Sequence, residues 1–434
     1  MAQTGDRVLR LDLLIYLVSL GFAAVSAAWS EFYGYRVWGN FATAGYLIAT
    51  LLTLYSLLSH RQNRVLRSRW TPVAVAGTLG ALVPMLVLVF RRAPSFVWGN
   101  WPWSFPSQPE VWVVERSARL LLDNGTPYPD LSLLERAAHP DDYTPYGPSM
   151  IIYGLPRALF GDGALTDARV AFLVASVLII LLALRVLGWP RVPVRAAQLA
   201  AISPLTLLTL SVAGDDIPVI ALIVLATALA YRANPVWAGI VCAVVATTKL
   251  TALPTLGVLA VAIVAYRGWR ALAPFLGAVL GASAVITVPV LLVDPRSFVE
   301  HVILFPAGLG QAKSPAASPL PGHLIAGLGP FGHAVALALL AAAACAIVAW
   351  LLLRPPQDPA GAVQRIAISL GTAIVLAPAT RWGYLVYPLA LFGAMLAFSA
   401  HQNDDAPEQG AAIRKAAGPT NDAVTSPDAR GSQT

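Results

Sequence analysis

Two glutamates accompany a stretch whose apolar residues recur at helical spacing. The apolar residues at helical spacing are Val111, Val114, Ala118, Leu121 and Leu122, and this period predicts an amphipathic helix lying on a membrane surface. A carboxylate held beside low-dielectric lipid could act as a general base that activates a hydroxyl. Acidic residues are also favoured at helix N-termini without any catalytic role. Glu110 and Glu115 are therefore catalytic candidates, with helix-end charge as the plainer interpretation.

A second pair of acids, Asp215 and Asp216, occupies a short turn between two long apolar runs. Ionisable residues at such positions are costly and indicate a functional site by default. Paired carboxylates could act as a base, hold a divalent cation or position a sugar. An Asp before Ile217 and Pro218 is also a helix start signal, so both interpretations stay open. A divalent cation is the only cofactor left open, because the six His and two Cys form no zinc-binding spacing.

Four cationic side chains could meet an anionic ligand. Lys249 lies where two apolar runs join and could neutralise a lipid phosphate or simply snorkel. Arg381 stands among aromatic residues of the kind that anchor membrane interfaces, which do not themselves account for the cation. Lys313 and His323 belong to a Pro-rich loop, where a lone His is commonly just a surface residue.

Aromatic residues gather in the same polar parts of the chain. Trp112, Tyr128, Tyr143 and Tyr146 lie in the longest polar interval, and their rings could stack on sugar faces. Trp and Tyr are also enriched at membrane interfaces without binding any ligand.

The elements that must position these residues are membrane helices. The chain has 434 residues, of which 57% are hydrophobic and 12% charged, whereas a soluble domain carries about 25% charged residues. Repeated long apolar runs predict an all-α polytopic membrane protein. The expected spans are 11–29, 41–59, 72–90, 168–188, 195–213, 217–232, 236–250, 251–267, 273–293, 331–353, 364–379 and 383–400.

The positions of the basic residues predict which ends of these helices face the cytoplasm. The strongest mark is the cluster of Arg61, Arg64, Arg67 and Arg69 between the second and third spans, because Lys and Arg concentrate in cytoplasmic loops. Twelve spans with both termini cytoplasmic place every candidate residue above on the outer face. The net charge of +7 then reflects membrane-flanking loops and does not indicate nucleic-acid binding.

This topology divides the chain into one integral membrane domain, 1–400, and a tail, 401–434, whose polar composition predicts disorder. The domain comprises a helix pair, 11–59, and a core, 72–400, with a large outer loop, 91–167, and a second outer loop, 294–330. No phosphate-binding loop or dinucleotide glycine pattern occurs, which disfavours a pump driven directly by ATP.

The order of these features resembles membrane glycosyltransferases of the GT-C type, and in particular glycosyltransferase family 87. The segment 120–128, LLLDNGTPY, is similar to the turn that ends that family's outer-loop helix, and 143–148, YTPYGP, is similar to its Tyr-Pro-Pro segment. The run from Ala238-Gly239 through Thr248-Lys249 to Pro254 resembles its Gly…Lys-x-x-Pro helix pair. The resemblance covers most of residues 95–390.

The resemblance implies a GT-C-like bundle of about twelve helices in a bacterial cell membrane, with its active site facing the exterior. It implies an inverting transferase that moves a sugar, expected to be mannose, from a polyprenyl-phosphate donor to a glycolipid or glycan acceptor. Carried over by position, the general base is Glu110, followed by Glu115. The candidates for the donor phosphate are Lys249, Arg381, Lys313 and His323.

Two features depart from the family pattern. The family usually has Asp where this chain has Glu110, so Asp215 or Asp216 remains an alternative base, and the helices before residue 60 precede the resembled core. A polyprenyl-lipid or small-solute transporter is the rival function, and it would require acids near the membrane midplane and an inverted repeat. A non-catalytic membrane scaffold would need no such concentration of acids, cations and aromatics on one face.

Overall fold

The structure of the protein, a computed structural model, describes residues 2–59, 64–92 and 106–416. The chain is 79% helical, and the only β-type pairing in the described part is an isolated bridge between Ala317 and Thr380. The fold is therefore that of an all-α polytopic membrane protein, as the sequence predicts. The helices are α1 (Ala2–Trp29), α2 (Tyr33–Leu58), α3 (Arg64–Arg67), α4 (Trp70–Gly77), α5 (Val83–Phe90), α6 (Pro109–Asn124), α7 (Leu155–Phe160), α8 (Ala168–Val186), α9 (Val194–Ala200), α10 (Pro204–Val212), α11 (Asp216–Arg232), α12 (Pro235–Thr248), α13 (Pro254–Arg267), α14 (Leu272–Val293), α15 (Pro295–Phe298), α16 (Pro321–Ala326), α17 (Pro330–Leu353), α18 (Pro359–Leu376) and α19 (Val386–Ala416).

Each of the twelve expected spans contains helix, but the count of twelve is not confirmed. By length and hydropathy, nine helices of the described chain can cross a membrane, or ten if α9 and α10, bent by 48°, form one span. The bend follows from local sequence, because Ser203 caps α10 with its hydroxyl and Pro204 occupies the first helical position. With 17 and 14 residues, α11 and α12 are shorter than the ~20 residues that a span needs.

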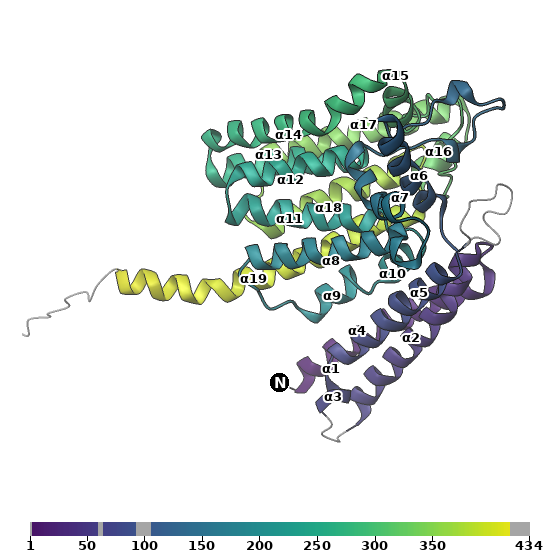
Figure 1. The fold of residues 1–434 in the computed structure, drawn as a ribbon. Helices are drawn as coiled ribbons and strands as arrows, with labels where there is room; N and C mark the ends of the chain where they lie inside the picture. The colour runs from purple at the N-terminus through teal and green to yellow at the C-terminus, as the bar shows by residue number, and fades with distance from the viewer. Residues whose placement is uncertain (1, 60–63, 93–105, 417–434) are drawn as a thin grey trace, which may run out of the picture.

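The N-terminal helices form a bundle with an apolar core of its own. Figure 1 shows α1, α2, α4 and α5 inclined beside the main bundle. Trp38 is fully buried there and donates from Nε1 to the Gly80 carbonyl at 2.8 Å. A Cβ at Gly39 would meet the Ala27 nitrogen at 2.5 Å, so only glycine permits this close crossing of α1 and α2. This packing extends α2 eight residues before its expected start at 41.

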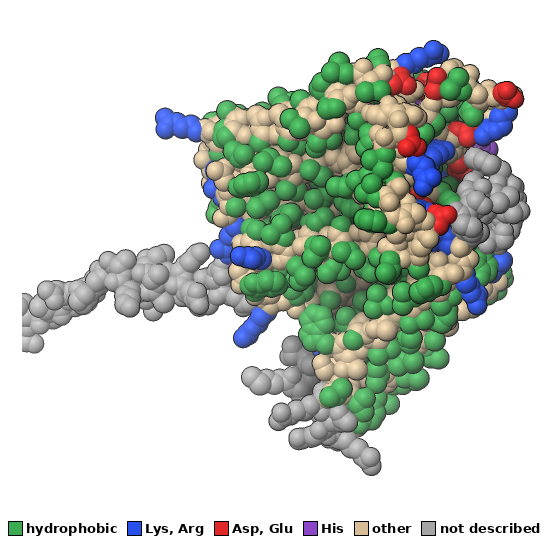
Figure 2. All heavy atoms as spheres, in the orientation of Figure 1, with side chains coloured by type: hydrophobic (Ala, Val, Ile, Leu, Met, Phe, Trp, Pro, Cys, Tyr) green, Lys and Arg blue, Asp and Glu red, His purple; other side chains and the backbone are tan. Residues whose placement is uncertain are grey.

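Polar structure gathers at one end of the main bundle. Figure 1 shows α6, α7, α15 and α16 together at the end opposite to the one from which α19 extends. In Figure 2 the acidic side chains visible on this face lie mainly at that polar end. The bundle thus brings together the outer loops that the sequence separates.

Two expectations for polar segments need correction. Val111 and Val114 on α6 are fully buried within the protein, so the apolar face of the helix packs on the 3-10 segment Pro148–Gly154, α7 and α8 and not on lipid. Helix α19 continues to Ala416, so the tail is not irregular from 401; extending an existing helix avoids the cost of nucleation. Residues 417–434 lie outside the described chain.

Candidate active site

Helix α6 begins at the polar end and presents Glu110 in its first turn. Pro109 occupies the first helical position, where its missing N–H costs nothing. The helix stops at Gly125, whose φ of 75° is the left-handed conformation that glycine adopts freely. Burial of Val111, Val114 and Ala118 fixes the rotation of α6. The position of Glu110 is therefore set by both helix ends and by the core.

Glu110 forms an ion pair with Arg381, which lies 271 residues away in the turn between α18 and α19. The guanidinium donates from Nη1 to Oε1 of the glutamate. Burial alone would lower the pKa of Arg381, but the neighbouring Glu110 holds that pKa above its ordinary value. The second carboxylate oxygen, Oε2, is buried and has no hydrogen-bond partner among the described residues. An unpaired buried carboxylate oxygen is costly and marks a position where a donor from a ligand would be stabilising.

A second charged cluster joins the α10–α11 turn to the end of α12. Lys249 donates to Asp215 at 3.0 Å and also to Asp216. Tyr146 donates to Asp215 at 3.2 Å, and Tyr387 donates to Asp216 at 2.8 Å. The Lys and both Asp side chains are less than 10% exposed. This cluster satisfies its own charges, because the ammonium bridges the two carboxylates.

The two clusters are neighbours. Burial raises the pKa of the Tyr146 hydroxyl well above its ordinary value, and the charges that act on that hydroxyl include Asp215, Lys249 and Glu110. Lys249 lies 5.5 Å from the centre of the Tyr146 ring and 5.4 Å from that of Tyr384. The structure thus brings together six of the residues singled out from the sequence: Glu110, Asp215, Asp216, Lys249, Tyr146 and Arg381.

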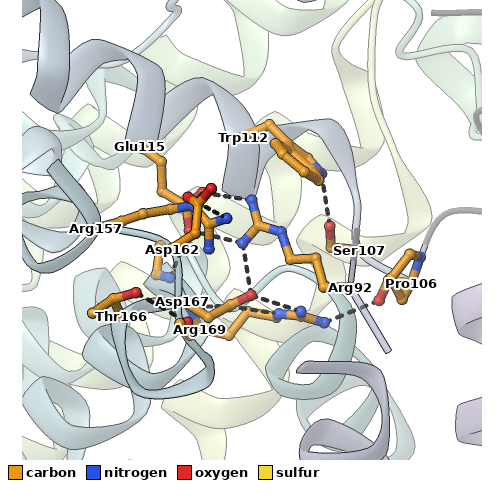
Figure 3. Close-up of polar contacts among 12 residues, drawn as sticks. Arg92, Pro106, Ser107, Trp112, Glu115, Arg157, Asp162, Thr166, Asp167 and Arg169 are labelled. Atoms are coloured by element: carbon orange, nitrogen blue, oxygen red, sulfur yellow. Dashed lines mark hydrogen bonds and ion pairs between the residues drawn. The ribbon is translucent and has the colours of Figure 1, made fainter. Parts of the chain in front are cut away.

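Glu115, one turn and a half along α6, lies in a different environment. Figure 3 shows its carboxylate enclosed by arginine side chains. It accepts a hydrogen bond of 2.8 Å from Arg92 and one of 2.9 Å from the Ala168 backbone N–H, and it lies 3.4 Å from Arg157. Both oxygens are engaged, in contrast to those of Glu110.

The same arginine network continues to Asp167 and holds Trp112. Arg92 donates to Asp167 at 2.6 Å, and Arg169 contacts the same carboxylate at 2.8 Å. Burial opposes ionisation, but these two guanidinium groups hold the pKa of Asp167 well below its usual range. Trp112 donates to Ser107 at 3.0 Å and lies under the Arg92 guanidinium, 3.8 Å from the ring centre (Figure 3). The network therefore ties α6 to α8 and orients Trp112 toward arginine.

Tyr128 and Tyr143 pack around a buried histidine of the second outer loop. His301 accepts from the Thr144 N–H at 3.0 Å through Nδ1 and donates through Nε2 to the Pro129 carbonyl at 2.8 Å. Tyr128 stacks on this imidazole, and Tyr143 stacks on Phe305 with ring centres 4.0 Å apart. Burial lowers the pKa of His301 to about 4. These contacts join the segment that carries Tyr128 and Tyr143 to the segment that carries His301, and both tyrosines are buried.

The remaining phosphate candidates lie in the loop before α17. Lys313 is exposed. His323 is half-buried and donates through Nδ1 to the Pro378 carbonyl at 2.8 Å, which links it to the turn that carries Arg381. In the part of the chain that the structure describes, no group of three or more His, Cys, Asp or Glu side chains is arranged to hold a metal ion.

Sequence reasoning did not single out three residues of this site. Tyr384 and Tyr387 lie within six residues of Arg381, and that proximity in sequence was the available signal. Tyr35 of α2 accepts a hydrogen bond from Gln108, next to the start of α6, and lies in the field of Glu110 and Arg381. No pattern in the sequence connects α2 with that helix start.

The protein is a multi-pass helical membrane bundle whose buried carboxylates and cations meet at one end. The chain belongs to glycosyltransferase family 87, because the family model matches residues 143–378, just over half of its length. It is thus a membrane glycosyltransferase, which favours sugar transfer over the transport alternative. The match includes Asp215, Asp216 and Lys249, whereas Glu110 and Arg381 lie outside it. No curated protein and no solved structure matches the chain.

Proposed function

We propose that the protein transfers a sugar, mannose in the first instance, from a polyprenyl-phosphate donor to a hydroxyl of a glycolipid or glycan, with inversion at the anomeric carbon. The site faces the exterior of a bacterial cell membrane, and both termini are cytoplasmic. The observation that carries this proposal is the carboxylate of Glu110, which pairs with Arg381 and has one buried oxygen that no described residue contacts by a hydrogen bond.

Glu110 acts as the general base. Its Oε2 accepts the proton of the acceptor hydroxyl while that oxygen forms a bond to the anomeric carbon. On the opposite face the bond from the anomeric carbon to the phosphate oxygen breaks, and its electron pair leaves with the polyprenyl phosphate. No proton donor is needed for this leaving group, because a phosphate is already a weak base.

Arg381 is the proposed ligand of the donor phosphate. In the described chain only one of its N–H groups is engaged, by Glu110, and the side chain is about one-third exposed, at 32%. The free edge of a guanidinium matches phosphate oxygens and would neutralise the charge that develops on the leaving group. Lys313 and His323 are further candidates for this contact.

Asp215, Asp216 and Lys249 form a buried ion-pair cluster that supports the site. Since Lys249 already bridges both carboxylates, its charge is committed, and Asp215 and Asp216 are less suited than Glu110 to take up a proton. Glu115 is likewise held by arginines. We assign these four residues to positioning the site.

The short helices support access for a lipid-borne donor. The 14 residues of α12 extend roughly 21 Å at 1.5 Å per residue, less than the ~30 Å of a bilayer core. Lys249, at the end of α12, then lies within the bilayer and does not reach its exterior surface. A polyprenyl phosphate entering between helices would meet the site from the side.

The test measures sugar transfer in membranes from polyprenyl-phosphate-mannose to a membrane-soluble glycoside, with wild type, Glu110→Gln and Asp123→Asn. Asp123 is an exposed acid on the same helix, so its variant controls for loss of one charge from α6. We expect Glu110→Gln to lose at least about 100-fold in turnover, within the range that general-base catalysis contributes, and Asp123→Asn to keep wild-type activity. Full activity of Glu110→Gln would refute the assignment.

The proposed orientation has a separate test. In a variant whose two native cysteines are replaced by Ala, a membrane-impermeant maleimide should label a cysteine introduced at Lys313 in intact cells. A cysteine introduced at Arg270 should react only after the cells are opened. The reverse labelling pattern would show that the protein has the opposite orientation in the membrane.

A further inference from the structure

The helix that carries the proposed base begins at a residue that contacts three parts of the chain. Gln108 immediately precedes α6, and its backbone N–H donates to the carbonyl of Val212, the last residue of α10, at 2.9 Å. Its own carbonyl accepts from the Val111 N–H at 3.2 Å. Its side-chain amide donates to the hydroxyl of Tyr35 on α2. Because Glu110 lies two residues after Gln108, a movement of Gln108 moves the first turn of α6.

The side chain of Gln108 holds α6 from outside the helix. A residue at this position commonly accepts a hydrogen bond from an N–H of the first helical turn. Gln108 makes no such contact, and its amide is directed to α2 instead. An amide N–H is a donor only, so the Tyr35 hydroxyl is the acceptor. Gln108 therefore links the start of α6 to a helix residue 73 positions earlier in the chain.

The start of α2 packs closely against the same region. A Cβ added to Gly34 would lie 3.3 Å from the Val212 side chain and 3.5 Å from the Pro106 carbonyl oxygen. The buried Arg169 guanidinium donates to that Pro106 carbonyl at 2.9 Å and to the Ser211 carbonyl at 3.2 Å. The start of α2 is thus fixed against the segment before α6, so a side chain of α2 can hold that segment in place.

We propose that Tyr35 is a positioning residue for sugar transfer, whose hydroxyl holds the Gln108 amide and thereby fixes Glu110 at the start of α6. The proposal rests on the proposed role of Glu110 as the general base. Catalysis is sensitive to such geometry, because a displacement of about 1 Å can reduce the rate about 100-fold. The N-terminal helix pair lies before residues 143–378, which the family model matches, and it is then part of the catalytic unit.

The test compares Tyr35→Phe with Tyr33→Phe in steady-state transfer from polyprenyl-phosphate-mannose to octyl α-mannoside. Tyr33 is the matched control, because it lies two residues earlier on α2 and its hydroxyl accepts from Arg91 at 3.1 Å in an exposed contact. We expect Tyr35→Phe to lower kcat about 10-fold, the equivalent of one hydrogen bond. Both KM values and the unfolding temperature should stay close to wild type, and Tyr33→Phe should keep wild-type kcat. A merely structural role would lower the unfolding temperature and leave the turnover of each folded molecule unchanged.

Double variants test whether Tyr35 acts through Gln108 and Glu110. Gln108→Met keeps the length of the side chain without its amide, so it should lower kcat as Tyr35→Phe does, and the two changes together should cost no more than either alone. In a Glu110→Gln background, Tyr35→Phe should have no further effect. Wild-type kcat in Tyr35→Phe would overturn the proposal. So would a fall that persists undiminished in Glu110→Gln, because the hydroxyl would then act on another group.

Hydrogen exchange of the protein in detergent separates this proposal from the proposed function. The backbone amides of residues 111–114 should exchange faster in Tyr35→Phe than in wild type or Tyr33→Phe, and those of residues 118–124 should not change. Full activity of Glu110→Gln, or no transfer by wild type, would remove the proposed base or reaction. Faster exchange at 111–114 would still support the hold of Tyr35 on α6, and unchanged exchange there would refute it.

Discussion

Exchanging Glu115 for Gln removes one charge from α6 while keeping the side-chain shape. In the structure the carboxylate is 5% exposed and pairs with Arg92, itself 3% exposed. The variant would leave Arg92 with Asp167 as its remaining acid partner, and the new amide N–H groups would face guanidinium donors. We therefore expect a loss of folding stability with little change in chemistry.

The expected magnitude follows from burial. Breaking one side of a buried ion pair costs about 3–5 kcal/mol because the remaining charge is left uncompensated. At about 2 °C per kcal/mol for a large domain, thermal unfolding in detergent should shift down by roughly 6–10 °C. Transfer activity per folded molecule should remain near wild type.

The comparison with Glu110→Gln makes this measurement decisive. That variant should lose turnover with a much smaller shift in unfolding temperature, because one oxygen of Glu110 has no partner among the described residues and its ion-pair partner Arg381 is 32% exposed. If Glu115→Gln instead unfolds at the wild-type temperature and loses turnover, the structural and catalytic roles of the two acids have been assigned the wrong way round.

Two further predictions concern buried groups near the site. Because burial lowers the pKa of His301 from 6.5 to about 4, the unfolded chain binds more protons between these values, so stability should fall as pH drops through this window, by about 3 kcal/mol at about 1.4 kcal/mol per pKa unit. Unfolding temperatures measured from pH 7 to 4 should show this slope in wild type and lose it in His301→Gln; an equal slope in both would refute the assignment. Lys249→Met should leave Asp215 and Asp216 uncompensated and lower the yield of folded protein on size exclusion, and adding Asp215→Asn and Asp216→Asn should recover it. A well-folded Lys249→Met that no longer binds donor would make Lys249 the phosphate ligand instead.

Local sequence was sufficient for the helical architecture. Every expected span contains helix, because the apolar runs that predict a helix lie within the helix itself. The number of spans was less predictable. Helices α11 and α12 are apolar but too short to span a bilayer core. Their lengths became known only from the three-dimensional structure.

The pairing of charges could not be predicted from residue type. Glu110 and Glu115 look alike in sequence, yet Glu110 pairs with Arg381 from the turn between α18 and α19, and Glu115 pairs with Arg92, which follows the end of α5. From the sequence, Lys249 is a candidate phosphate ligand. In the structure it pairs with two carboxylates, Asp215 and Asp216, at the start of α11. In each case the partner is tens to hundreds of residues distant.

The sequence by itself determined that this is a membrane bundle with its acids, cations and aromatics gathered at one face, because hydrophobic burial and charge sidedness depend on composition and local order. The tertiary structure alone decided which carboxylate keeps an unpaired oxygen and which serve as internal counter-ions. Electrostatic interactions in a buried site depend on distances of a few ångströms between side chains, and only the packing of distant helices sets those distances.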